Sequence, residues 1–136
     1  MARGYVESRS RHGVWVSRMK NYLFVMRHLP HFSSRVQETL DQMLTTAAFD
    51  QTVSVLFVDD GVFQLKQAQD PENMVLKNTA AMFLALEMYE INNLYVEAES
   101  LAERGLSVND LILPIEVVPR EGVGGLLNRH DVVISD

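Results

Sequence analysis

The 136-residue chain has no cysteine. Without a thiol it can form no disulfide, no thiolate metal site and no nucleophilic thiol or persulfide. It also lacks any apolar run close to the roughly 20 residues that a membrane-spanning helix needs. These absences exclude thiol chemistry and a disulfide scaffold, and we expect a soluble, cytoplasmic protein that does not cross a membrane.

Positive charge is scarce beyond the first eighteen residues. Residues 1–18 hold four Arg against one Glu, a local charge of +3, while the whole chain has a formal charge of −6. The other 118 residues therefore carry −9. Because an acidic surface repels phosphate backbones, we expect no direct contact between this chain and a nucleic acid.

The same eighteen residues lack helical or strand periodicity, and we interpret them as a disordered extension. They lack the apolar stretch of a secretory signal, although their Arg-rich, acid-poor composition also fits a transit peptide. We favour Met19 as the natural start. The chain is 47% hydrophobic, which is enough for one core, and it is too short for two ordinary domains. We therefore expect a single domain over residues 19–136.

Short apolar runs alternate with amphipathic segments along this domain. Strands are predicted at residues 22–26, 52–58, 94–96, 111–118 and 132–134, and helices at residues 34–48, 71–89, 99–104 and 121–128. Continuous apolar runs are typical of strands buried on both faces of a parallel sheet. Pro114 cannot donate to a strand ladder, so we place its strand near an edge. The pattern predicts an α/β three-layer sandwich with a mostly parallel five-stranded sheet, as in flavodoxin-like folds.

Two pairs of polar residues follow the first two strands. Asp59 and Asp60 come after the second strand, and His28 and His31 follow the first. Because open α/β sheets bind ligands at this edge, one hypothesis is a stand-alone flavodoxin-like module that binds a nucleotide or metal through these four residues. Two His without a third ligand make a poor zinc site. We favour a structural role for the Asp pair, which caps the following turn, and expect no metal and no cofactor.

The remaining candidates for catalysis are weak. His130 precedes Asp131, but no Ser on a strand-turn-helix elbow accompanies them, and a catalytic triad needs such a nucleophile. The glycine-rich residues 122–125 lack the Lys-Ser/Thr pair of a phosphate-binding loop. We therefore expect no catalytic residue and a chain that is not an enzyme.

The predicted helix at residues 71–89 has more large apolar side chains than one buried face takes up. Met82, Phe83, Met88 and Tyr89 all lie on it or close to it. A helix that is apolar on most sides usually contacts another subunit. We predict an interface formed by these four residues together with Phe63.

One segment resembles a known family. The stretch Asp59-Asp60-Gly61-Val62-Phe63-Gln64-Leu65 is similar to the signature of the TusC/DsrF family of sulfur-relay proteins, which have the DsrE-like fold. Weaker similarity supports it at residues 47–50, 55–57, 69–70, 94–96, 100–106 and 131–133. Together these segments extend the resemblance over residues 19–136.

The resemblance implies a non-catalytic subunit of a heterohexameric sulfurtransferase complex. Its partners would be TusB/DsrH-like and TusD/DsrE-like subunits in a dimer of heterotrimers, which pass persulfide sulfur toward 2-thiouridine at the tRNA wobble position. The alternative is a DsrF-like subunit of a DsrEFH complex in dissimilatory sulfur oxidation. In the TusD/DsrE-type paralogues the sulfur-carrying Cys follows the strand that matches residues 94–96, and Glu97 stands there in this chain. A carboxylate cannot form a persulfide.

Overall fold

A five-stranded parallel sheet organises the protein. The computed structural model describes residues 8–9, 15–16, 20–29, 34–65, 84–111 and 115–136. The strand order is β6-β5-β4-β3-β7, and every neighbouring pair is parallel. The strands are β3 (Asn21–Met26), β4 (Thr52–Phe57), β5 (Asn93–Glu97), β6 (Glu116–Val118) and β7 (Val132–Ser135). The predicted α/β fold with a five-stranded sheet is confirmed.

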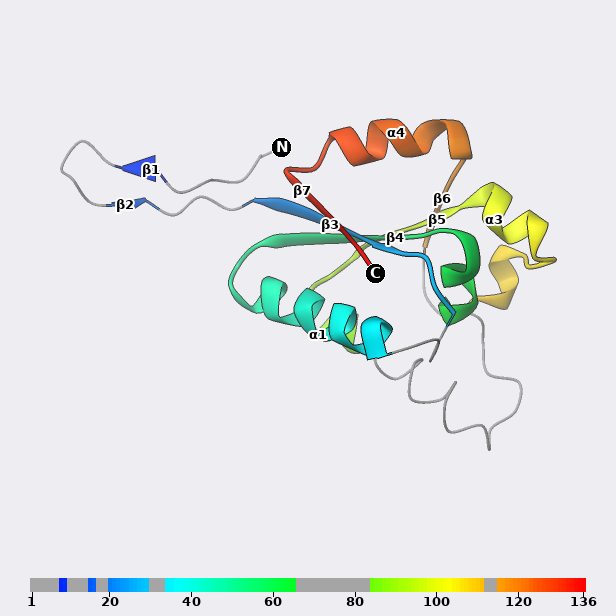
Figure 1. Ribbon diagram of the computed structural model, residues 1–136, viewed down its shortest axis with the longest axis horizontal. Coiled ribbons are helices and arrows are strands. Elements are labelled where there is room, and N and C mark those ends of the chain that lie inside the picture. Colours follow the sequence, from blue (N-terminus) through cyan, green and yellow to red (C-terminus); the bar gives the residue numbers. More distant parts are fainter. Residues whose placement is uncertain (1–7, 10–14, 17–19, 30–33, 66–83, 112–114) are drawn as a thin grey trace.

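Helices cover both faces of this sheet (Figure 1). α1 (Ser34–Ala48) lies on one face and α4 (Arg120–Asn128) on the other. α3 (Ala98–Glu103) follows β5 directly, and the 3-10 helices are η1 (Asp59–Leu65) and η2 (Val108–Asp110). Residues 84–88 are helical, and the rest of the predicted helix at residues 71–89 lies outside the described residues, apart from the turn at 89. The arrangement is the predicted three-layer sandwich.

The central strands supply side chains to two separate cores. On the α1 face, Phe24 and Phe57 are fully buried, and α1 adds Met43 to the same cluster. On the α4 face, Leu23 of β3 is fully buried beside Leu126 of α4. Because β3 and β4 are covered on both faces, their sequences are continuous apolar runs and not alternating ones.

The shorter strands form the two edges of the sheet. β6 is three residues long, whereas the sequence predicted a strand from residue 111, and η2 precedes it. Its edge position confirms the placement derived from Pro114, although Pro114 itself lies outside the described residues. β7 forms the opposite edge beside β3.

Two further strands lie near the amino terminus. β1 (Ser8–Arg9) pairs with β2 (Trp15–Val16) in the antiparallel sense. They are the only parts of residues 1–18 that the structure describes, so the interpretation of this segment as an extension stays a prediction. Among the described helices, none has the length and apolar character to span a membrane.

Candidate functional site

The carboxyl edge of the sheet brings together the residues that follow the first three strands of the domain. β3, β4 and β5 are parallel neighbours. The segments after them, namely residues 27–29, η1 and α3, therefore start side by side at this edge. Since open α/β sheets bind ligands here, it is the first candidate for a site.

The first feature of this edge is a close backbone contact. Val58 N donates a hydrogen bond to Met26 O at 3.1 Å, and Gly61 N donates to Val58 O at 2.9 Å. A Cβ added to Gly61 would overlap the carbonyl group of Met26. Only glycine permits such an approach between two backbones. The glycine of the Asp59–Leu65 motif thus allows η1 to pack against the end of β3.

Asp59 and Asp60 at the start of η1 both face arginines. Both Nε and Nη2 of Arg27 lie 3.4 Å from Oδ2 of Asp59. Arg104 Nε donates to Oδ1 of Asp60 at 3.0 Å. These carboxylates are about half exposed, so each pair stabilises the fold only slightly. The Asp pair therefore links η1 to the loop after β3 and to the end of α3.

A buried carboxylate is the second feature of the edge. Glu97, the last residue of β5, has a side chain that is only 7% exposed. Its Oε1 accepts hydrogen bonds from Ser100 Oγ at 2.6 Å and from Arg120 Nη2 at 3.0 Å. Arg120 also contacts Glu103 at 3.1 Å, and its backbone N–H donates to Glu99 at 2.8 Å. These contacts hold the first turn of α4 against β5 and α3.

The ion pairs of this cluster shift two pKa values. Hydrogen bonds to Glu97 and then to Glu103 hold the pKa of Arg120 above its ordinary value. The hydrogen bond from Arg120 lowers the pKa of Glu103, and the nearby charge of Arg104 acts in the same direction. Arg120 and Glu103 are therefore both charged near neutral pH, and the pair between them persists there.

Ser100 connects the two clusters. Its hydroxyl donates to Glu97 and accepts the backbone N–H of Asp59 at 2.8 Å, and the residue is fully buried. Asp59 has φ 51, a left-handed conformation that Asp and Asn tolerate better than most residues. The hydrogen bond from Asp59 N to Ser100 Oγ holds this turn in place. The carboxyl edge is thus a connected network of ion pairs and hydrogen bonds whose charged groups already have partners.

His28 belongs to a different part of the edge. Its Nδ1 lies 3.1 Å from Oδ1 of Asp136, which also accepts from Arg27 N at 2.8 Å. Gln64 Nε2 donates to His28 O at 2.8 Å. His28 and the Asp pair therefore have separate partners, and His31 lies outside the described residues. Within the part of the chain that the structure describes, no group of three or more His, Cys, Asp or Glu could hold a metal ion.

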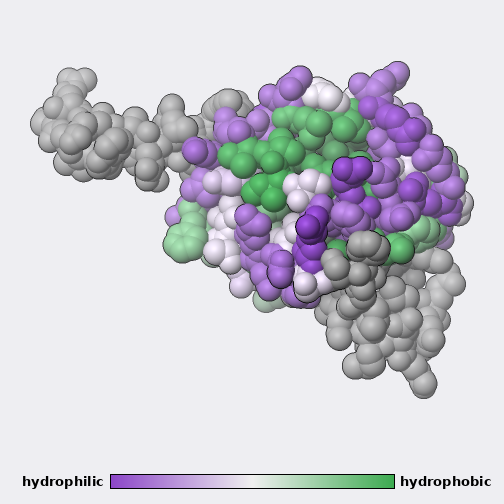
Figure 2. Space-filling model, in the orientation of Figure 1, coloured by the Kyte–Doolittle hydropathy of each residue, from purple (hydrophilic) through white to green (hydrophobic). Residues whose placement is uncertain are grey.

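The predicted interface residues have different environments. Phe63 is half-buried in η1, whereas Met88 is 83% exposed and Tyr89 is 47% exposed. Met82 and Phe83 lie outside the described residues. The interface assignment stays a prediction. A large apolar patch is exposed near the edge strand β7 and α4 as well (Figure 2), where Val133 is 45% exposed.

Sequence reasoning missed two features of this molecule. The pair of Glu97 and Arg120 joins residues that are 23 positions apart, and its only sequence signal was a carboxylate at the end of a buried strand. Phe49 is 73% exposed although it follows a helix of the core. The sequence feature that could have indicated this exposed side chain is an aromatic residue directly after the end of that helix.

Comparison with known proteins identifies relatives over almost the whole chain. Residues 20–135 match the DsrE/DsrF-like family. The chain is 40% identical to a protein named TusC homolog from Pseudomonas aeruginosa over 116 residues, which cover 85% of this chain and 98% of the relative. It is 34% identical to the intracellular sulfur oxidation protein DsrF of Allochromatium vinosum over 131 residues, with 86% and 96% coverage.

A solved structure has the same fold. The ychN protein from E. coli superposes with a TM-score of 0.69 and covers 87% of this chain and 100% of its own, at 16% sequence identity. At this identity the likeness concerns the fold alone.

Proposed function

The chain belongs to the DsrE/DsrF-like family, and from that membership we propose that it is a non-catalytic subunit of a sulfur-relay complex. The observation that carries the proposal is the 40% identity to a TusC homolog over nearly the full length of both chains. The carboxyl edge supports it. Glu97 occupies the position at which we expect the sulfur-carrying Cys of the paralogues, and its carboxylate is held by Arg120 and Ser100.

The partners of this subunit are TusB/DsrH-like and TusD/DsrE-like proteins in a dimer of heterotrimers located in the cytoplasm. The complex passes persulfide sulfur toward 2-thiouridine at the tRNA wobble position. The tRNA contact belongs to a partner, since residues 19–136 carry a net charge of −9. This chain contributes surfaces that hold the sulfur-carrying subunit in place.

A second candidate function is that of a DsrF-like subunit in dissimilatory sulfur oxidation. The relative named DsrF favours it, at 34% identity over 131 residues. Both candidates use the same chemistry and differ in the acceptor of the sulfur. The higher identity to the TusC homolog favours tRNA thiolation.

Co-expression with the two paralogous subunits tests the proposal. One tag is placed on the TusD-like subunit, and the purified material is analysed by size-exclusion chromatography with light scattering. We expect this chain to co-purify in equal amount with both partners, at the mass of a heterohexamer. A chain that elutes alone as a monomer would reject the proposal in favour of a stand-alone flavodoxin-like module.

A further inference from the structure

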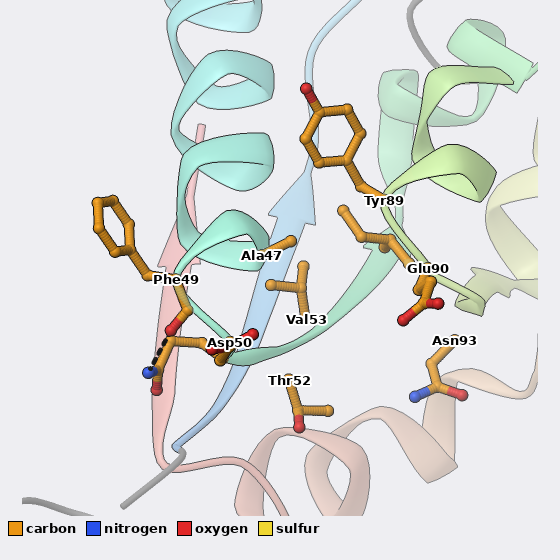
Figure 3. Close-up of a pocket in the computed structure, with 10 residues that line it drawn as sticks. Ala47, Phe49, Asp50, Thr52, Val53, Tyr89, Glu90 and Asn93 are labelled. Carbon is orange, nitrogen blue, oxygen red and sulfur yellow. Dashed lines mark hydrogen bonds between the residues drawn. The ribbon is translucent and has the colours of Figure 1, made fainter. Parts of the chain in front are cut away.

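An open hollow lies at the amino edge of the sheet, opposite the network of ion pairs (Figure 3). Its volume is about 610 Å³, and it lies between two connections, the one from α1 to β4 and the one from helical residues 84–88 to β5. Ala47, Val53 and Ile91 contribute apolar lining, and Val53 and Ile91 are buried in the core below. The hollow therefore has an apolar floor between two loops.

Two carboxylates border this floor. Figure 3 shows Asp50 and Glu90 on opposite sides of the hollow, with Val53 between them. Neither carboxylate has a hydrogen-bond or ion-pair partner among the residues that the structure describes. No Lys, Arg or His is among the described residues that line the hollow. Within the part of the chain that the structure describes, the rim thus carries two carboxylates without a partner above apolar side chains.

Both acidic residues hold a strained backbone conformation. Asp50 and Glu90 each have φ 62, and each follows an aromatic residue at the end of a helix. Glycine adopts this left-handed conformation without strain, whereas other L-residues do so at a cost. The hydrogen bonds of a helix end hold Glu90 in this conformation, since Glu90 N donates to Glu87 O and Ile91 N donates to Leu86 O. Asp50 and Glu90 therefore each close the carboxyl end of a helix, and these two turns place their carboxylates on facing sides of the hollow.

Exposed apolar side chains surround the acidic rim. Phe49 is 73% exposed, and Figure 3 shows its ring turned away from the hollow. Tyr89 is 47% exposed and Met88 is 83% exposed on the opposite loop and helix. Aromatic residues and Met are enriched at protein interfaces. The chemistry of the hollow and its rim is therefore that of a contact surface for another protein.

We propose that this hollow receives a Lys or Arg side chain of a partner subunit in the relay complex. The inference rests on the proposed function and adds the contact surface to it. A long cationic side chain matches the lining because its methylene stem packs on apolar surface while its head stays beside charge and water. Ala47, which is only partly buried, would contact the stem above Val53, and Asp50 and Glu90 would bind the head. The ring of Phe49, which faces away from the hollow, and the exposed ring of Tyr89 would contact the partner surface beside it.

A charge-neutralising variant tests this contact in the full chain. In D50N/E90Q both carboxylates become amides of the same size, and Asn tolerates the left-handed conformation at position 50. E38Q/E116Q removes two exposed carboxylates from α1 and β6, outside the hollow, as the matched control. The dissociation constant for the partner subunits is measured by calorimetry at two salt concentrations. We expect D50N/E90Q to bind at least fivefold more weakly and with a smaller salt dependence, and the control to bind like the native chain.

The outcomes separate this inference from the proposed function. If the native chain forms no complex with the partners, the proposed function fails. If the native chain forms the complex and D50N/E90Q changes the dissociation constant by less than fivefold, the inference about the hollow is wrong and the proposed function stands. If the variant instead abolishes a self-association of the native chain and leaves partner binding unchanged, the occupant is a second copy and the inference is overturned.

A second variant separates binding from folding. D50G/E90G relieves the backbone strain and removes the carboxylates together. We expect its melting temperature to rise by about 3 °C while its partner affinity falls at least fivefold. If D50G/E90G binds the partner subunits as tightly as the native chain, the inference is contradicted. A fall in affinity cannot be attributed to unfolding, because this variant is expected to be more stable than the native chain.

Discussion

The guanidinium of Arg120 lies 3.0 Å from the carboxylate of Glu97, and the two partners differ sharply in burial. The Arg120 side chain is 50% exposed, whereas that of Glu97 is 7% exposed. If Glu97 loses its charge, Arg120 can turn to water. If Arg120 is removed, the buried Glu97 carboxylate keeps Ser100 as its one partner among the described residues. Loss of Arg120 should therefore lower the free energy of unfolding more than loss of the Glu97 charge does.

We predict that R120Q destabilises the protein more than E97Q does. E97Q keeps an acceptor for Ser100 and loses a charge-assisted hydrogen bond, which costs about 1 kcal/mol. R120Q leaves the Glu97 carboxylate buried beside a single donor, which is less favourable. Urea denaturation of both variants and of the double variant measures the order. If R120Q lowers the free energy of unfolding less than E97Q does, the prediction is wrong and the Glu97 carboxylate has another stabilising partner.

We predict that G61A is strongly destabilising because a Cβ at this position overlaps the carbonyl of Met26. The backbone must shift at the junction of η1 and β3, and the expected loss is about 2–4 kcal/mol. Gly124 in α4 is the matched control, since nothing lies within 4 Å of an added Cβ there. G124A is expected to gain up to about 1 kcal/mol from helix propensity. Thermal unfolding measures the stability of both variants. Equal changes in G61A and G124A would contradict the close contact between Gly61 and Met26.

We predict a pH dependence at Glu103, whose pKa is lowered chiefly by the hydrogen bond from Arg120. A carboxyl with a lower pKa in the folded state stabilises the protein above its unfolded pKa and loses this contribution as pH falls through the folded pKa. The side chain is exposed, so the effect is small and is screened by salt. An NMR titration should give a pKa below the ordinary Glu value, and R120Q should raise it again. A titration unchanged by R120Q would contradict this assignment.

We predict that M88D weakens assembly without weakening the fold. Met88 is 83% exposed, so a charge there should change the free energy of unfolding by no more than about 0.5 kcal/mol. In an interface the same charge would be desolvated without a partner, and we expect affinity for the partner subunits to fall about tenfold or more. D59N is the control, because its pair with Arg27 is exposed and long. If M88D assembles as fully as the native chain, Met88 is not part of the interface.

Much of the fold could be predicted from local sequence. Continuous apolar runs located β3 and β4, and Gly105, with φ 69, ends the predicted helix after β5. Pro114 indicated an edge strand without any knowledge of the strand order. These signals depend on a few neighbouring residues and on the physical preferences of single amino acids.

The candidate site depended on contacts that local sequence does not contain. Asp59 and Asp60 were expected to cap a turn, but their arginine partners come from segments 32 and 44 positions away. The hollow between Asp50 and Glu90 exists only because parallel strands bring two separate loops to one edge of the sheet. Which side chains meet across the sheet follows from strand order, and strand order is a property of the whole chain.

A sulfur-transfer assay tests the central claim most directly. The TusD-like subunit is loaded with radiolabelled persulfide sulfur, and transfer to the downstream acceptor is followed with and without this chain. We predict that transfer is fast only when the chain is present, and that the label never appears on the chain itself. Transfer at an equal rate in its absence, or label bound covalently to this cysteine-free chain, would contradict a role that acts through contact surfaces.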